Sequence, residues 1–379
     1  TIPKFFFTVS FVACFNLALN AQTSVVQKID NASLYAGIEV GSKGVKMSLL
    51  QINAGDKDSR SYNMLKDTSI NTDFISFTQS TYLATLNALN KLYEVASVDY
   101  KIPSSHIFTA ISSGVNIQAV KENKLNWIEQ LAGAFKFNYN EPDRKVTVID
   151  VVEEARLSHL GIVPDSKRYN TFLIDIGSGN TKGGYFPNGN TKTFKLFQLS
   201  WGTKSTSNAT EKRMEGDNSL ENFNKNLGRV LTAAENSEIA YAVNESGSFP
   251  LSDNIVFSGG IAWALATLMY PELIDNAVVP VSYDEVLKFN ERILNSHPTL
   301  SDYYIVKTLT DKTLDTDAIG KAVKNVNKVF DQKALLAGTG LLLKIMRQFE
   351  SAHERKNFYF VRNGAVGWIT AYVNQNFAN

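Results

Sequence analysis

A short internal repeat is the feature that most narrows the folds open to this chain. Segment 38–46 reads IEVGSKGVK and segment 174–182 reads IDIGSGNTK. In each, an apolar stretch ends in an acid, a Gly-Ser turn follows, and a second strand-like stretch leaves the turn. This order predicts two β-hairpins with glycine tips. Because a repeated unit indicates related structural halves, we expect a duplicated architecture.

The tips of these hairpins have the composition of anion-binding loops. Glycine lets backbone N–H groups approach an anion closely, and consecutive N–H groups in a turn form an anion-binding nest. Ser42, Ser178 and Asn180 add side-chain donors, and the acids before the turns, Glu39 and Asp175, are suited to a hydrated Mg²⁺ ion. A lone hairpin of this kind is usually only a tight turn. Two at matched places predict paired phosphate-binding loops.

The rest of the chain alternates predicted strands and helices, which is typical of the α/β class. Further strands are expected at 106–111, 145–151, 190–199, 254–257 and 358–361. Helices are expected at 78–96, 116–135, 153–160, 219–242, 261–270, 284–294, 318–350 and 365–374, and a polar loop at 202–217. The chain of 379 residues has room for about two domains. We place them at 33–163 and 170–363, with a hinge near 163–169 and the last helix packing back on the first domain.

The first 21 residues have the order of a secretory signal peptide. Lys4 precedes an apolar run over 5–19, and small and polar residues follow up to Ala21. The run is shorter than the ~20 apolar residues that a membrane-spanning helix needs. We therefore expect cleavage after Ala21, a secreted or periplasmic protein, and no membrane span afterwards. A membrane anchor, a buried helix and a lipoprotein are the alternatives; the lipoprotein is disfavoured because Cys14 lies inside the apolar run.

Composition excludes several classes of site. The formal net charge is +1, so no general field for nucleic acid is indicated, and a bound anion must be held by local donors. The one cysteine excludes a disulfide within the chain. The four histidines lack metal-binding spacing. Basic residues after the second hairpin form either a solvated face or a guide for an extended anion: Lys192, Lys195, Lys204, Lys212 and Arg213.

These features resemble a known superfamily. Two glycine hairpins and a strand–Gly-Gly–helix unit at 258–260 resemble the actin, sugar-kinase and heat-shock chaperone ATPase superfamily. The sequence EEARL at 153–157, followed by Leu160-Gly161, is similar to the Ppx/GppA branch, the exopolyphosphatases and guanosine pentaphosphate phosphohydrolases. A closing GAVG at 364–367 agrees, and the similarity extends over 34–375. The resemblance implies a two-domain, actin-like α/β fold with an interdomain cleft.

The resemblance also implies roles for individual residues. Glu154 would orient and deprotonate the attacking water, and Glu39 and Asp175 would accompany Mg²⁺. Arg156 is expected to form a structural ion pair. Residues expected to bind phosphate are Gly41, Ser42, Lys43, Gly177, Ser178, Gly179, Asn180, Lys182, Ser258, Gly259 and Gly260.

Four positions depart from the family pattern. Glu39 replaces a usual Asp, Lys182 a usual Glu and Asn116 a usual Arg, and Asp150-Val151 replaces a Ser-Gly. Lys182 exchanges a potential metal ligand for a cation, so it is expected to bind phosphate directly and partly replace the metal.

The expected function is hydrolysis of a terminal phosphoanhydride in polyphosphate or a related, nucleotide-like polyphosphorylated compound. The departures favour an alternative, a catalytically impaired protein that binds phosphate or nucleotide on the same fold. A small-molecule kinase is disfavoured because ATP is scarce outside the cytoplasm. A homodimer is left open.

Overall fold

The computed structural model describes residues 34–52, 62–249, 251–350, 354–362 and 367–377. The expected signal peptide and residues 364–366 lie outside the described residues. Within the described part of the chain, no helix combines the length and the apolar character needed to cross a membrane.

The first half of the chain forms a five-stranded sheet with the order β3-β2-β1-β4-β5. Its strands are β1 (Leu34–Val40), β2 (Gly44–Ile52), β3 (Tyr62–Asn71), β4 (Ile107–Ile111) and β5 (Val146–Val148). The strands β1, β2 and β3 form an antiparallel meander, whereas β4 and β5 run parallel to β1. The hairpin predicted from the first repeat segment is β1–β2.

The second half repeats this topology in a six-stranded sheet with the order β10-β11-β9-β6-β7-β8. Its strands are β6 (Thr171–Ile176), β7 (Thr181–Tyr185), β8 (Lys195–Leu199), β9 (Asn254–Ser258), β10 (Val278–Val281) and β11 (Asn357–Val361). The meander β6–β7–β8 corresponds to β1–β2–β3, and the parallel strands β9 and β11 correspond to β4 and β5. β10 is an added antiparallel edge strand. The duplicated, actin-like α/β fold is confirmed.

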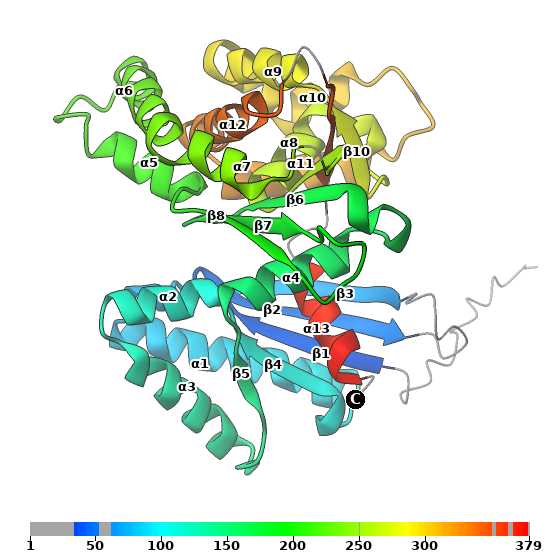
Figure 1. Cartoon of the computed structure of the whole chain (residues 1–379). Coiled ribbons are helices and arrows are strands. Elements are labelled where there is room, and N and C mark those ends of the chain that lie inside the picture. Colours follow the sequence, from blue (N-terminus) through cyan, green and yellow to red (C-terminus); the bar gives the residue numbers. More distant parts are fainter. Residues whose placement is uncertain (1–33, 53–61, 250, 351–353, 363–366, 378–379) are drawn as a thin grey trace, which may run out of the picture.

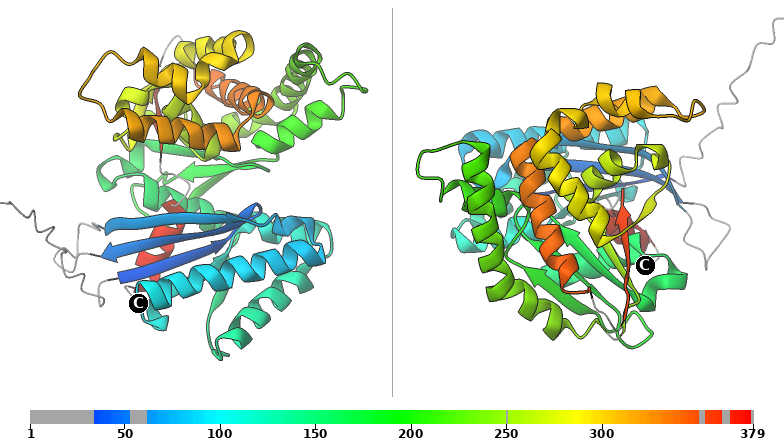
Figure 2. Two further views of the ribbon diagram at one scale, coloured as in Figure 1. Left: turned by 180° about the vertical axis from the view of Figure 1, so that it is seen from behind. Right: turned by 90° about the horizontal axis from the view of Figure 1, so that it is seen from above.

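Helices cover both sheets and fill the space between them (Figures 1 and 2). The first sheet carries α1 (Gln79–Glu94), α2 (Ser113–Lys121) and α3 (Leu125–Asn138) on its outer face. Helices α4 (Val151–Ile162) and α13 (Gly367–Phe377) lie between the sheets. The far side of the second sheet carries α5 (Thr203–Glu211), α6 (Leu220–Ala234), α7 (Ala240–Ser246), α8 (Gly260–Met269), α9 (Tyr283–Ser296), α10 (Asp302–Thr308), α11 (Thr316–Val329) and α12 (Gln332–Arg347).

The two central helices join the halves. α4 packs against α13 and β7, and α13 packs against β1. The helices approach so closely that a Cβ at Gly161 would collide with the carbonyl oxygen of Gly367. Leu157 of α4 and Trp368 of α13 share one buried cluster with Ala110 of β4. Because α4 and α13 contact each other and strands of both sheets, they hold the two halves of the chain together.

Three predicted elements differ from the structure. The helix expected at 318–350 is two helices, α11 and α12, because the backbone is extended at 330–331 between them. Residues 116–135 are not one helix: α2 ends before Asn123, whose φ of 54° is left-handed, and Lys124 N–H bonds back to Ala119 O at 2.7 Å. This is a common way for a helix to end. Residues 202–217 are not a loop, because 203–211 form α5. α5 buries Thr206 and Thr210 and packs on α12, so tertiary contacts outweigh its weak local helix propensity. Strands β3 and β10 and helix α10 were not expected.

Candidate functional site

The two glycine turns are closed by equivalent backbone hydrogen bonds. Gly41 N–H donates to Gly44 O at 2.9 Å in the first turn, and Gly177 N–H donates to Asn180 O at 3.0 Å in the second. In both hairpins, the acid lies directly opposite a lysine on the neighbouring strand. Glu39 pairs in register with Lys46, and Asp175 pairs in register with Lys182.

These two pairs meet Glu154 of α4. The pKa values of Glu39 and Asp175 respond to the charges of Lys46, Lys182 and Glu154, so the five groups lie within electrostatic range of one another. We call Glu39, Lys46, Glu154, Asp175 and Lys182 the acid–lysine cluster. It contains three carboxylates and two ammonium groups, and it draws on both halves of the chain and on the helix between them.

Local interactions at the start of α4 direct Glu154 into the cluster. Asp150 caps the helix by accepting the N–H of Glu153 at 2.8 Å, so both glutamates lie in the first turn. Glu153 points outward and forms an ion pair with Arg156, with an N–O distance of 2.7 Å. Glu154 points inward and is buried. The expectations that one of the two glutamates faces the site and that Arg156 is structural agree with this geometry.

Both oxygens of Glu154 have partners. Oε2 accepts the backbone N–H of Ser113 at 2.7 Å, at the N-terminus of α2. Oε1 forms an ion pair with Nζ of Lys182. Burial favours the protonated acid, but Lys182 and the Ser113 N–H outweigh it and lower the pKa of Glu154. The partial positive charge of a helix N-terminus acts in the same direction.

Lys182 keeps its charge although it is largely buried. Its side chain is 12% exposed. Burial opposes the charged form, but the carboxylates of Glu154, Asp175 and Glu39 outweigh it and raise the pKa of Lys182. The cluster therefore holds a stable ammonium among its carboxylates.

Glu39 and Asp175 differ in their hydrogen bonds. Burial raises the pKa of both. The residue beside Asp175 on β9 is Ser258, whose Oγ donates to Asp175 Oδ1 at 2.9 Å. The residue beside Glu39 on β4 is Ala110, which has no donor, and Glu39 Oε2 has no hydrogen-bond partner in the described structure. A side-chain hydrogen bond from Trp368 of α13 partly offsets the effect of burial on the pKa of Glu39.

The second turn is held by α5 and α8. The N–H groups of Thr203 and Lys204 donate to the carbonyl oxygens of Gly177 and Ser178 at 3.0 and 2.8 Å. Gly202 allows this approach, because a Cβ there would lie 2.6 Å from Gly177 O. Gly259 begins α8 with a φ of 91°, and its missing Cβ leaves room for Ile176 O and Asp175 Oδ1.

The first turn has lysines at its rim. Lys43 forms an ion pair with Asp73. The pKa of Lys204 on α5 is lowered, first by its contact with Lys43 and then by burial. Two lysines from opposite halves of the chain thus lie side by side, and an anion between them would relieve their repulsion. Ser42 also lies near the start of α2, because a Cβ at Gly114 would be 3.1 Å from Ser42 Oγ.

A divalent metal ion does not fit this arrangement. The described residues contain no group of three or more His, Cys, Asp or Glu side chains that could hold a metal. Mg²⁺ usually keeps several waters and is held by one or two free carboxylates in near-octahedral geometry. Glu154 is already bound by an ammonium and an amide, and Lys182 would repel a second cation.

The structure thus gathers most of the residues singled out from the sequence, although their roles stay predictions. Ser258 and Gly259 adjoin Asp175, while Ser178 and Gly179 form the exposed tip of the second turn. Asn116 lies in α2. Sequence reasoning missed the part played by Ser113, Lys46 and the backbone of α5. The matched lysines of the repeat were a usable signal for Lys46; no local pattern marks Ser113.

His159 of α4 is not part of the acid–lysine cluster. It is buried against Phe186 and Phe194, and its Nε2 lies 3.0 Å from Thr171 O. Because a carbonyl oxygen can only accept, Nε2 carries the proton. Burial lowers the pKa of His159 to about 4.

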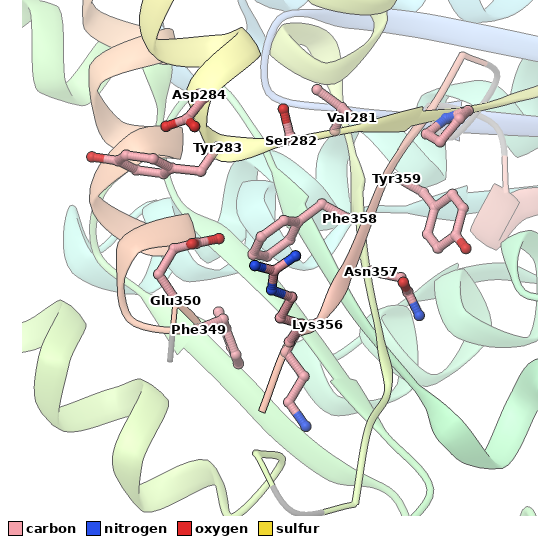
Figure 3. A pocket seen from close by; sticks show the side chains of 12 residues that line it. Val281, Ser282, Tyr283, Asp284, Phe349, Glu350, Lys356, Asn357, Phe358 and Tyr359 are labelled. Atoms are coloured by element: carbon pink, nitrogen blue, oxygen red, sulfur yellow. The ribbon is translucent and has the colours of Figure 1, made fainter. Parts of the chain in front are cut away.

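A separate pocket of about 860 Å³ opens beside β10, the start of α9 and β11 (Figure 3). Phe349, Phe358 and Tyr359 line it together with Asp284 and Arg355. None of the residues predicted for phosphate chemistry lines it. The pocket is therefore separate from the acid–lysine cluster.

Comparison with solved structures shows the same fold in known phosphatases. A crystal structure of the Aquifex aeolicus Ppx/GppA family member has a TM-score of 0.59 at 17% identity, covering 90% of this chain and 98% of that chain. An exopolyphosphatase from Cytophaga hutchinsonii has a TM-score of 0.57 at 13% identity, with 90% and 98% covered. No protein-family model and no curated protein matches the chain by sequence. The resemblance to the Ppx/GppA structures is thus confirmed in the fold, which this chain shares over nine-tenths of its length.

Proposed function

We propose that this protein hydrolyses the terminal phosphoanhydride bond of polyphosphate or a related polyphosphorylated compound. The observation that carries the proposal is the placement of Glu154, a buried carboxylate between two glycine turns in a fold shared with Ppx/GppA phosphatases. We further propose that the protein is secreted to the periplasm, as residues 1–21 suggest.

In the proposed reaction, turn N–H groups hold the terminal phosphate and Glu154 orients a water molecule. Each carboxylate oxygen can accept two hydrogen bonds, so each oxygen of Glu154 can still accept one from a water besides its bond to Ser113 or Lys182. The water oxygen forms a bond to phosphorus, the bond to the bridging oxygen breaks, and the water proton passes to Glu154. The products are orthophosphate and a chain shorter by one phosphate. The lowered pKa of Glu154 makes it a weak base, but phosphoryl transfer depends more on positioning than on proton removal.

A second candidate function is ligand binding without turnover. The ion pair between Lys182 and Glu154 favours it, because the ammonium both occupies the carboxylate and lowers its basicity. In this case the same turns and lysines retain a polyphosphorylated ligand as a sensor or carrier would.

Phosphate release separates the two candidates. Polyphosphate, ATP and guanosine pentaphosphate are each incubated with the protein, and orthophosphate is measured. For a hydrolase, Glu154→Gln lowers release by about 100-fold or more, because a water-positioning group contributes roughly 10²–10⁴-fold. The matched control is Glu153→Gln, which removes the outward-facing neighbour and leaves release unchanged.

Equal release by Glu154→Gln and wild type would reject the role of Glu154. Saturable binding of these ligands with no release by the wild type would favour the second candidate.

A further inference from the structure

The lysines of the acid–lysine cluster occupy equivalent places in the two halves. Each lies opposite an acid, in the same register relative to a glycine turn. Residues directly opposite each other on neighbouring strands project from the same face of a sheet. Lys46 and Lys182 are therefore delivered to the same region as Glu39 and Asp175, one from each sheet.

The charge of Lys182 is balanced by nearby carboxylates. Its ammonium pairs with Glu154, and the carboxylates of Asp175 and Glu39 also attract it. An ammonium has three N–H donors, of which the ion pair with Glu154 uses one. Two N–H donors of Lys182 therefore remain for phosphate oxygens. Asp175 is partly exposed, so a ligand can approach the cluster from its side.

The same arrangement works against a divalent cation. Glu154 is already bound, and one oxygen of Asp175 accepts the Ser258 hydroxyl. Any dication drawn to the remaining oxygens would lie beside a charged lysine. We infer that this site binds its phosphorylated ligand without a divalent metal ion, with Lys182 and Lys46 supplying the positive charge. The inference rests on the proposed phosphate-binding function and defines how that function operates.

Two consequences distinguish such a site from a metal-dependent one. Its ligand is the free polyphosphate anion, so a chelator in the solution does not prevent binding. Replacing Lys182 with an acid would remove a cation and add a carboxylate near Asp175 and Glu39. Binding would then require a metal ion.

The test is calorimetric titration of wild-type protein with tripolyphosphate, once in excess EDTA and once in excess Mg²⁺. We expect the dissociation constant in EDTA to be equal to or lower than that in Mg²⁺. Binding in Mg²⁺ that disappears in EDTA would overturn the inference and leave the proposed function standing. No binding in either buffer would overturn both.

Variants then assign the charge to Lys182. Lys182→Gln is expected to weaken binding in EDTA by about tenfold to a hundredfold, the usual range for losing a charged hydrogen-bond donor. Lys182→Glu is expected to bind only with Mg²⁺. Lys225→Gln, on the exposed side of α6, is the matched control and should bind like wild type.

Thermal unfolding with and without tripolyphosphate checks that each variant is folded. The wild-type comparison of EDTA with Mg²⁺ needs no variant, so misfolding of a lysine variant does not affect it. Binding by folded Lys182→Gln that equals wild type in EDTA would overturn the role of Lys182.

Discussion

The two glycine hairpins have the same turn hydrogen bond and the same acid–lysine register, but their lysines have different surroundings. At the first turn, Lys43 forms an ion pair with Asp73 in which the side chains are 39% and 45% exposed. At the second hairpin, Lys182 pairs with Glu154, and the side chains are 12% and 3% exposed. The same contact between an ammonium and a carboxylate thus occurs once in water and once in the interior. Removing one partner should therefore cost much more stability in the buried pair than in the exposed pair.

The hairpins also differ in the support they receive from neighbouring strands. Ser258 on the neighbouring strand β9 donates to one oxygen of Asp175, whereas the hydrogen bond to Glu39 comes from Trp368 of α13 because Ala110 on β4 has no side-chain donor. The second turn is further fixed by backbone bonds from α5, while the first is held mainly by Thr72 N–H, which donates to Lys43 O at 2.9 Å. The second hairpin therefore carries the buried ion pair, although the tip of its turn is the more exposed of the two.

The largest expected effect tests the buried pair. Glu154→Ala leaves Lys182 buried without its main partner, and breaking one side of a buried ion pair costs about 3–5 kcal/mol. Chemical denaturation should show this loss in the free energy of unfolding. A loss below that for an exposed pair would mean that Lys182 reaches solvent, and the contrast between the hairpins would fail.

The next effect concerns the buried histidine of α4. An unfolded histidine titrates near 6.5, while His159 in the fold titrates near 4. As pH falls from 6.5 towards 4, protons bind the unfolded chain more than the folded one, so stability decreases over this window and levels off below it. The loss is about 3 kcal/mol, because one unit of pKa difference corresponds to about 1.4 kcal/mol.

Denaturation at a series of pH values checks this. In His159→Gln, the decrease in the free energy of unfolding between pH 6.5 and 4 should be smaller by that amount. An unchanged slope in His159→Gln would show that the titrating group lies elsewhere.

A smaller effect tests the support from α5. Gly202→Ala places a methyl group 2.6 Å from Gly177 O and 2.7 Å from Asn180 N. Such overpacking against backbone costs about 1–3 kcal/mol. At Gly179 an added Cβ meets nothing within 4 Å, so Gly179→Ala should leave the free energy of unfolding nearly unchanged. Similar values for the two variants would show that α5 does not clamp the turn.

The smallest effect is expected at the exposed pair. Asp73→Asn removes the charge that faces Lys43, and exposed ion pairs contribute about 0–1 kcal/mol. The unfolding free energy measured at low and high salt should differ little from wild type. A loss as large as that in Glu154→Ala would remove the distinction between the two hairpins.

Several elements could be predicted from the sequence because their signals are local. The Gly-Ser turns bounded by apolar strands specified both hairpins, and the helix at 153–160 was placed from its own residues. The helix at 203–211 could not be predicted in this way, because its polar residues become helical only where α12 covers them. The break within 116–135 depended on one left-handed residue, Asn123, which is not a strong signal by itself.

The residues of the site likewise fall into those placed by local sequence and those placed by tertiary packing. By itself, the sequence determined that two acids, two lysines and two glycine turns occur in matched positions, since strand register and turn chemistry depend on near neighbours. Only the tertiary structure decided that Lys182 and the Ser113 N–H both bind Glu154. These partners lie 28 and 41 residues from it, so they meet only after the helices and sheets have packed. That packing also excludes water from the ion pair between Lys182 and Glu154, and this burial strengthens the attraction between the two charges.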